Sequence, residues 1–288
     1  MEGEKKVLLT AVTATRDAVK GGRIASLERC VRSVAALKTA HEHLIYDGAS
    51  TDGTVELLMK WQGEIPGLKV VSEPDTGIYN ALNKGVRDAH GGYFYVVGDD
   101  DYIFRPEGLD EAVARVAKGD FDMGLSPVER DDGRRFDVSP RIMLWRMAYP
   151  HQGVIVRTEL VRQLNGFDES YRSSGDFDLH LRIHLKGANY LVLKDPYAVY
   201  SVSGTSSKNV ERARDEDARA LCSILGLDAS CQRMISKRRL LPILTALKLL
   251  RHPDFFIRTS ARHQVKRWIA WRLGLLDLAG QPRAFGFR

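Results

Sequence analysis

The 288-residue sequence has few cysteines and lacks several common signatures. Its cysteines, Cys30, Cys222 and Cys231, are odd in number and lack metal-ligand spacing, which argues against a disulfide framework and indicates a reducing compartment. The first residues, MEGEKKVLLT, pass from charged residues into a predicted strand without an apolar signal-peptide core, so we expect a cytoplasmic protein. Neither GxxxxGK[ST] nor GxGxxG follows the first predicted strand, which excludes a P-loop and a dinucleotide-binding fingerprint.

Basic residues are concentrated toward the C-terminus. Residues 231–276 hold eleven Lys or Arg and one acidic residue, which leaves 32 basic against 36 acidic residues elsewhere. A nucleic-acid partner is therefore not expected for the chain as a whole. The run LLPILTALKLL is far shorter than the ~20 apolar residues of a membrane span. Residues 255–276 mix Trp268 and Trp271 with Lys and Arg, which predicts a basic helix in a membrane interface; an appendage packed on the protein or on a dimer partner is the alternative.

Strand and helix patterns alternate through the first third of the chain. Short apolar runs are followed by segments whose apolar residues recur at helical spacing. Polar residues follow several of these runs, and open α/β sheets bind ligands at the carboxyl ends of their strands. The pattern predicts a doubly wound α/β sheet flanked by helices. The predicted strands are 7–12, 43–46, 68–71 and 93–97, and the predicted helices between them are 24–37, 55–61 and 79–89.

Three consecutive carboxylates, Asp99–Asp101, follow the fourth predicted strand. Like charges packed together need a counter-charge. A hard divalent cation suits such an all-oxygen cluster, and Mg²⁺ is usually held by one or two carboxylates together with substrate phosphates. A solvated acidic turn is the alternative. Lys84 and Arg87, on the preceding predicted helix, are candidates for neutralising phosphates, with ordinary solvated helix charges as the alternative.

Four segments occur in a specific order: VLLTAVTATRD, YDGASTDGT, SEPDTGIYNALNKG and a strand ending in GDDD. Together they resemble the family-2 glycosyltransferases of the GT-A fold, and most of all bacterial members that build capsule, exopolysaccharide or O-antigen units. The resemblance covers about the first 205 residues. It implies a mostly parallel mixed sheet in a domain at 1–205, with a nucleotide-sugar half at 1–104 and an acceptor half at 105–205. A helical extension is expected at 206–288.

The resemblance also implies a metal-dependent transfer from a nucleoside-diphosphate sugar. Asp101 is the expected ligand of Mg²⁺ or Mn²⁺, with Asp99 as its partner. Many relatives have Ser or Ala before a pair of aspartates, so which of the three carboxylates binds metal stays open. The residues expected to contact the nucleotide sugar are Thr13, Asp47, Asp75, Lys84, Asp99 and Asp100.

The second half of the chain carries the motifs HQG and NGFDESYRSSGDFDLHLRI, which resemble the acceptor half of the same family. Asp176 matches the position of the catalytic base, with a helix N-cap as the alternative role. The preceding residue is Gly175, where relatives often have an acidic residue. A single base that takes the acceptor's proton during in-line attack gives inversion. His151 and Gln152 are expected near the donor phosphate or the acceptor, although a lone His is otherwise more often structural.

The implied partners are a nucleoside-diphosphate sugar and a saccharide acceptor linked to polyprenyl diphosphate, with the inner face of the membrane contacted through the basic tail. The segment SGTSSKNVERARDEDARA begins as a Gly/Ser-rich loop, expected to be mobile over the active site, or else a linker. Two rival classes remain. A sugar-phosphate nucleotidyltransferase usually needs a Gly-rich basic motif after the first strand, which is missing. A non-catalytic nucleotide-sugar- or lipid-binding protein would not need Asp47, Asp101 and Asp176.

Overall fold

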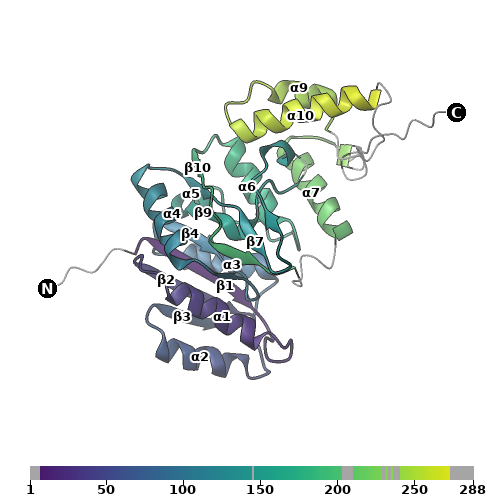
Figure 1. Ribbon diagram of the computed structural model, residues 1–288. Coiled ribbons are helices and arrows are strands. Elements are labelled where there is room, and N and C mark those ends of the chain that lie inside the picture. Colours follow the sequence, from purple (N-terminus) through teal and green to yellow (C-terminus); the bar gives the residue numbers. More distant parts are fainter. Residues whose placement is uncertain are drawn as a thin grey trace. The chain divides into compact units, whose positions relative to one another are not determined.

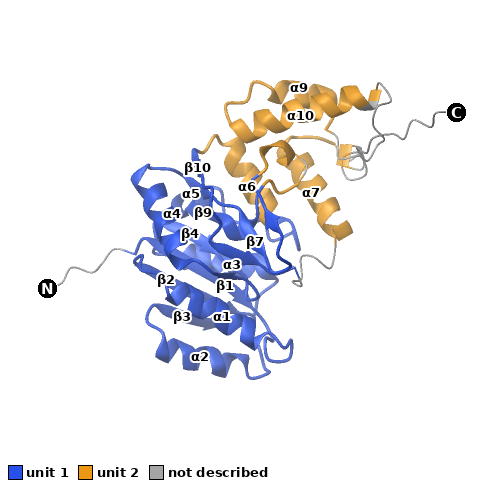
Figure 2. Cartoon of the chain, in the orientation of Figure 1, with its two compact units in different colours: residues 1–138, 149–175, 189–207 blue, residues 139–148, 176–188, 208–288 orange. Residues whose placement is uncertain are grey.

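A computed structural model describes most of the chain, and its contacts divide the chain into two compact units (Figure 2). The predicted domain boundary at 205/206 and the Gly/Ser-rich loop at 203–209 lie outside the described residues. Unit 1 comprises residues 1–138, 149–175 and 189–207, and unit 2 comprises residues 139–148, 176–188 and 208–288. The described residues are 7–144, 146–202, 210–228, 231–232, 235 and 241–272.

Unit 1 is built on a seven-stranded sheet with the order β10-β6-β9-β4-β1-β2-β3 (Figure 1). All neighbouring strands are parallel except β9, which is antiparallel to both β4 and β6. This confirms the predicted mixed, mostly parallel sheet. The strands are β1 (Leu9–Thr15), β2 (His41–Asp47), β3 (Leu68–Ser72), β4 (Tyr93–Val96), β6 (Met123–Leu125), β9 (Val154–Arg157) and β10 (Tyr190–Val192).

Helices connect the parallel strands, because parallel neighbours need a crossover. The buried face of α1 packs in one core cluster with α4 and in another with α2. Helix α3 lies directly on β1, since a Cβ at Gly85 would come within 2.6 Å of the Val12 side chain. Because β1, β2 and β3 are parallel, the loops that follow them lie together at the carboxyl ends of the strands. The helices are α1 (Ile24–Ala35), α2 (Thr54–Glu64), α3 (Ile78–Asp88), α4 (Pro106–Lys118) and α5 (Thr158–Gln163).

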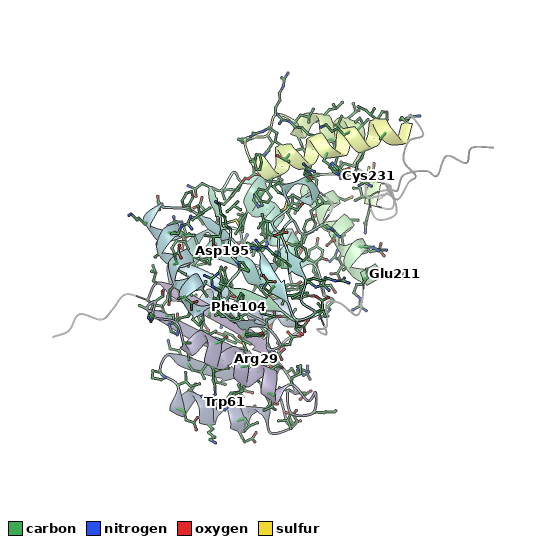
Figure 3. All side chains as sticks on the ribbon, in the orientation of Figure 1. Arg29, Trp61, Phe104, Asp195, Glu211 and Cys231 are labelled. Atoms are coloured by element: carbon green, nitrogen blue, oxygen red, sulfur yellow. The ribbon has the colours of Figure 1, made fainter. Side chains whose placement is uncertain are left out.

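A second, four-stranded sheet begins directly after Asp99–Asp101, which we call the acidic cluster. Its order is β5-β11-β7-β8. Beside β5, the Arg29 guanidinium lies 4.1 Å from the centre of the Tyr102 ring, and Phe104 follows the strand (Figure 3). The sequence does not predict this sheet, because two- and three-residue strands have no detectable periodicity. The strands are β5 (Tyr102–Ile103), β7 (Val128–Arg130), β8 (Arg135–Phe136) and β11 (Ala198–Tyr200).

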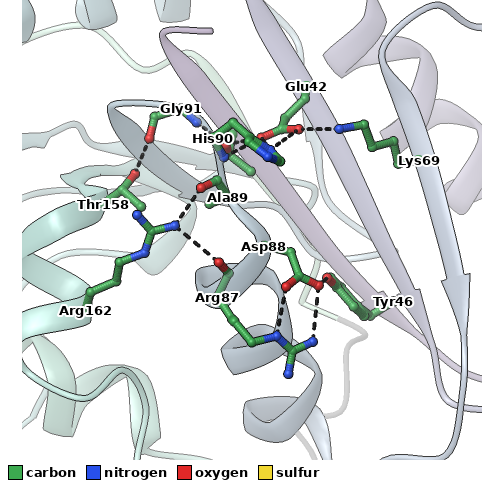
Figure 4. Close-up of polar contacts among 11 residues, drawn as sticks. Glu42, Tyr46, Lys69, Arg87, Asp88, Ala89, His90, Gly91, Thr158 and Arg162 are labelled. Carbon is green, nitrogen blue, oxygen red and sulfur yellow. Dashed lines mark hydrogen bonds and ion pairs between the residues drawn. The ribbon is translucent and has the colours of Figure 1, made fainter.

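A polar network fixes the C-terminal end of α3 (Figure 4). The Glu42 carboxylate accepts hydrogen bonds from the Thr10 hydroxyl, the His90 N–H and the Lys69 ammonium at 2.8, 2.7 and 2.9 Å. Burial disfavours the charged carboxylate, but these donors outweigh it and lower the Glu42 pKa. Arg162 of α5 donates to three carbonyl groups at the end of α3. These contacts anchor the C-terminal end of α3.

Unit 2 is helical in its described part. His184 Nδ1 lies 2.9 Å from Asp254 Oδ2 in the interior, and the Phe256 ring stacks on His184 with centroids 4.8 Å apart. The helix predicted within residues 255–276 is confirmed over Phe255–Arg272. Among the described residues, no helix combines the length and hydropathy needed to cross a bilayer. The helices are α6 (Gly175–Leu185), α7 (Val210–Ile224), α9 (Ile243–Leu249) and α10 (Phe255–Arg272), with a short 3₁₀ helix η1 (Pro140–Ile142).

Candidate active site

The loops that follow β1 and β2 are joined to each other by hydrogen bonds. Each bond runs from a backbone N–H of the first loop to a side chain of the second, so the first loop is shaped by polar residues of the second. This interlocking explains the Ser-Thr-Asp-Gly-Thr run at 50–54, whose side chains are the acceptors. The pairs are Asp17 to Ser50 at 2.7 Å, Val19 to Thr54 at 3.1 Å and Lys20 to Asp52 at 2.7 Å.

Asp47 ends β2 and is almost completely buried, at 1% exposure. Its Oδ2 accepts hydrogen bonds from the Ser50 N–H at 2.8 Å and the Ser72 hydroxyl at 2.7 Å. The Ser50 hydroxyl bonds the other carboxylate oxygen. The carboxylate therefore ties the loop after β2 to the end of β3, and its contacts are made within the protein.

Asp75 and Arg16 each have side-chain atoms close to the backbone of Gly48. A Cβ at Gly48 would lie 2.7 Å from Asp75 Oδ2 and 3.1 Å from Arg16 Cδ, so only glycine lets these side chains approach so closely. Lys84 contacts the loop that carries Asp75: its Nζ lies 2.8 Å from Glu73 Oε1 and donates to the Pro74 carbonyl at 2.9 Å. Lys84 thus supports the loop that carries Asp75.

Thr13 faces the interior of unit 1. Its hydroxyl donates to the Val97 carbonyl at 3.0 Å and lies 2.9 Å from His43 Nε2, and its side chain is fully buried. Thr13 therefore fixes the end of β4, just before the acidic cluster. Thr15 was not among the predicted site residues, yet this β1 residue contacts the cluster by donating to Asp99 Oδ2 at 2.7 Å.

Arg23 is a second contact of the cluster that sequence reasoning missed. Its Nε donates to Asp99 Oδ2 at 3.1 Å, and its Nη2 donates to the Arg16 carbonyl at 2.7 Å. The side chain of Asp99 is 16% exposed. Arg23 directly precedes α1, far from any recognisable motif, so only the folded chain shows that it reaches the strand end.

Asp101 is buried, at 3% exposure. Its Oδ1 accepts the Ser201 N–H and its Oδ2 accepts the Gln152 side-chain amide, both at 2.8 Å. Burial and the neighbouring Asp100 raise the pKa of Asp101 to about 7. Burial and Asp99 raise the pKa of Asp100 in the same way. The adjacent carboxyls are therefore short of positive charge, as an oxygen-ligand cation site would be.

Among the residues that the structure describes, a full set of protein metal ligands is not brought together. Within the described ranges, no three His, Cys, Asp or Glu side chains converge as ligands of one ion. The donor set itself suits Mg²⁺ or Mn²⁺, since it consists of carboxylate oxygens whose charge is under-compensated. One or two carboxylates suffice when substrate phosphates complete the coordination.

His151 and Gln152 belong to the 3₁₀ turn η2 (His151–Gly153) before β9. Gln152 is the partner of Asp101 described above. The His151 ring makes an edge contact with Phe167, with centroids 6.2 Å apart. The turn is held tightly, because a Cβ at Gly153 would lie 2.1 Å from the Ser126 carbonyl oxygen. Gln152 therefore contacts the acidic cluster directly, while His151 packs against an aromatic ring.

Asp176 lies in the first turn of α6, and its Oδ1 accepts the Phe177 N–H at 2.9 Å. It belongs to unit 2, whereas the acidic cluster belongs to unit 1. Its expected role as the catalytic base stays a prediction.

Comparisons with known sequences identify relatives of this chain. The family model described as Glycosyl transferase family 2 matches residues 21–172, which include α1, α3 and the acidic cluster. An uncharacterized glycosyltransferase of Mycobacterium tuberculosis is 28% identical over 170 residues, or 55% of this chain and 64% of that protein. A PGL/p-HBAD biosynthesis glycosyltransferase of Mycobacterium bovis is 25% identical over 167 residues, with the same coverage. The chain thus spans about two thirds of the length of these relatives.

Solved structures share the fold. S. aureus TarS 1–349, in complex with UDP-GlcNAc, superposes with a TM-score of 0.61 at 18% identity, covering 94% of this chain and 93% of that one. A mannosyltransferase of Pyrobaculum calidifontis, in complex with GDP-Man and Mn²⁺, gives 0.63 at 18% identity, covering 96% and 78%. The family match extends over more than half of the chain, and the sheet and strand-end loops agree with it. The chain therefore belongs to glycosyl transferase family 2 and has the GT-A fold.

Proposed function

We propose that this protein is an inverting glycosyltransferase that moves a sugar from a nucleoside-diphosphate sugar to a hydroxyl group of a saccharide. One observation carries the proposal: carboxyls short of counter-charge, Asp100 and Asp101, stand where β4 ends, beside the interlocked loops after β1 and β2. A strand-end site of this kind suits a ligand that brings a diphosphate and a cation.

Mg²⁺ or Mn²⁺ is the proposed cofactor, with Asp99, Asp100 and Asp101 as its candidate ligands. When bound, the cation supplies electrostatic stabilisation to the departing diphosphate. Asp101 has both carboxylate oxygens engaged inside the protein, whereas Asp99 receives its two described side-chain contacts at Oδ2 alone. Asp99 and Asp100 are therefore better placed to face a ligand, and Asp101 holds them in position.

The nucleoside is proposed to bind over Gly48. Side chains of Arg16 and Asp75 lie close to this glycine, and they would offer a guanidinium and a carboxylate to the polar ring of a nucleobase. Asp47, Lys84 and Thr13 support this surface through the loop contacts described above. The structures named above hold UDP-GlcNAc and GDP-Man, which makes a nucleoside-diphosphate sugar the ligand class to test.

The transfer itself needs one base. The acceptor hydroxyl oxygen attacks the anomeric carbon, the bond from that carbon to the diphosphate oxygen breaks, and the nucleoside diphosphate leaves with the bonding electrons. Asp176 takes the proton of the hydroxyl. Attack opposite the leaving group inverts the configuration, so an α-linked donor gives a β-glycoside. His151 and Gln152 are proposed to line the acceptor side.

The saccharide acceptor is proposed to be linked to polyprenyl diphosphate, which places the reaction at the inner face of the membrane. The tail supports this: Leu244, Leu247 and Phe255 are 71%, 44% and 52% exposed, and Lys248 and Arg251 lie near them in the chain. Exposed apolar groups among cations suit an anionic lipid surface. Within α10, Ile269 is also exposed, at 48%, whereas Phe256, Ile257 and Ala261 are buried within unit 2.

Thermal unfolding with a panel of nucleoside diphosphates tests the donor site. We expect one nucleoside diphosphate with Mn²⁺ or Mg²⁺ to raise the melting temperature, and chelator to remove the shift. Asp100→Asn should abolish the shift, whereas Asp137→Asn, whose side chain is 70% exposed, should retain it. No metal-dependent shift with any nucleotide would refute the proposal. A protein that shows this thermal shift, keeps it in Asp176→Asn and transfers no sugar would instead be a non-catalytic binding protein.

Vesicle co-sedimentation tests the membrane surface. We expect the full chain to bind phosphatidylglycerol vesicles and not to bind phosphatidylcholine vesicles. The double variant Leu244→Glu/Leu247→Glu should lose binding. Met59→Glu, at a 50% exposed position of unit 1, is the matched control and should bind like the wild type. Equal binding by the double variant would assign the tail to protein packing instead.

A further inference from the structure

The chain segment that leads into Asp176 is held by one face of helix α3. The ring of Tyr79 stacks on Phe167 with centroids 5.7 Å apart and planes inclined by 21°. Tyr79 is 6% exposed, so this contact is part of the interior of unit 1. The aromatic pair fixes the start of the segment 167–175.

The same ring fixes the end of that segment. A Cβ built at Gly175 would lie 2.8 to 2.9 Å from three atoms of the Tyr79 ring, closer than real Cβ atoms come to other atoms. Position 175 therefore accepts only glycine while the ring keeps its place, and the backbone at 175 rests directly on Tyr79. Asp176 is the next residue, so its backbone nitrogen is bonded to the carbonyl carbon of Gly175, which rests on this ring.

Further contacts from α3 reinforce the arrangement. Asn83 donates to the Phe167 carbonyl at 2.9 Å and accepts the Phe167 N–H at 2.8 Å. Asn80 and Asn83 each donate to the Glu169 carboxylate at 2.9 Å. Gly166 has a φ of +65°, and its hypothetical Cβ would lie 2.3 Å from Asn83 Oδ1. The segment is thus bonded to α3 at consecutive points before it reaches Gly175.

Helix α3 also begins directly after the loop 73–77, which carries Asp75 and is the proposed nucleoside loop. Asp75 accepts the Gly77 N–H at 3.0 Å, and α3 starts at Ile78. Arg172, from the segment before α6, donates to the Thr76 carbonyl of that loop. One rigid helix therefore carries the proposed nucleoside loop at its N-terminus and, on its side, the ring under Gly175.

We propose that Tyr79 is a positioning residue for the transfer reaction: through its contact with Gly175 it fixes the backbone to which the base Asp176 is directly bonded. This inference rests on the proposed function. Its physical reason is that catalysis by a positioned group depends steeply on distance, and a displacement of about 1 Å can cost about 100-fold in rate. A ring packed on a glycine transmits a displacement directly, because no flexible side chain lies between them.

Gly175→Ala tests the proposal in the full-length protein. The probe is the release of nucleoside diphosphate from the sugar nucleotide that the panel identifies, with water replacing the acceptor. We expect kcat to fall at least about tenfold while the donor KM and the metal-dependent thermal shift keep their wild-type values. Gly63→Ala is the matched control, because Gly63 is also a helical glycine and nothing lies within 4 Å of its Cβ.

A double-mutant cycle separates positioning from a general loss of stability. In a Tyr79→Ala background the space is open, so adding Gly175→Ala should change kcat by less than about twofold. Additive losses, or a loss that follows the melting temperature alone, would overturn the proposal. If the wild type gives no metal-dependent shift, the proposed function has failed. If Asp176→Asn lowers kcat and Gly175→Ala does not, only the role of Tyr79 has failed.

Discussion

Acidification should weaken unit 1 through a single buried histidine, His43. The Thr13 hydroxyl donates to the Val97 carbonyl, so the His43 Nε2 that lies 2.9 Å from that hydroxyl must carry its own hydrogen. The other ring nitrogen, Nδ1, has no hydrogen-bond partner among the described residues. A second proton would sit on that nitrogen without an acceptor, in a residue that is 3% exposed.

The size of the effect follows from the pKa. Burial, with a smaller contribution from the nearby His41, lowers the pKa of His43 from 6.5 to about 3. The unfolded chain therefore binds this proton first as the pH falls below 6.5, and the folded chain only near pH 3. Stability is complete above pH 6.5 and is lost as the pH approaches 3. The loss between pH 8 and pH 5 is about 2 kcal/mol, or roughly 4–8 °C in melting temperature.

The assay compares melting temperatures at pH 8 and pH 5 for the wild type and for His43→Gln, which keeps a donor for Thr13 and cannot be protonated. We expect the wild type to lose roughly 4–8 °C more than the variant over this range. His90→Gln, whose side chain is 68% exposed, is the control and should retain most of the wild-type acid sensitivity. An equal loss in His43→Gln and the wild type would refute the reasoning.

Three further predictions concern other contacts. Glu42→Gln should destabilise the protein by about 1–3 kcal/mol, measured by denaturant unfolding. A glutamine oxygen can still accept from Thr10 and His90, but the amide nitrogen then faces Lys69 and the charge-assisted bond is lost. No change would mean that the network is dispensable. Gly153→Ala should yield little soluble protein, since Ser126 leaves no space for a Cβ, while Gly63→Ala expresses normally. Gln152→Ala should weaken metal-dependent nucleotide binding about tenfold in a titration, as Asp101 loses its amide donor; an unchanged affinity would contradict that role.

Much of the fold could be predicted from the sequence, because its signals are local. The helices over 24–35, 54–64 and 78–88 lie within a few residues of the predicted ranges, since their apolar periodicity is regular. The predicted end of the first strand was wrong. β1 continues to Thr15, because residues 13–15 pair with residues 45–47, and three polar or small residues in succession look like a loop without their partner strand.

The site was predicted less completely, since its contacts join distant segments. The aspartates were identifiable because they follow strands. Arg23 and Thr15 were not, because nothing near them in the sequence indicates that both reach Asp99. The partner of Asp101 is equally remote: Gln152 lies 51 positions away, and its amide contact depends on the register of β9 against β4.

The ion pair between Lys69 and Glu42 has a consequence for self-association. β3 forms one edge of the large sheet, and Lys69 lies in the second position of that five-residue strand with its side chain 56% exposed. A short edge strand that presents a lysine is a poor template for pairing with another chain. The opposite edge, β10, has three residues and offers little backbone to pair. Both free edges of the sheet are thereby protected against strand-to-strand aggregation.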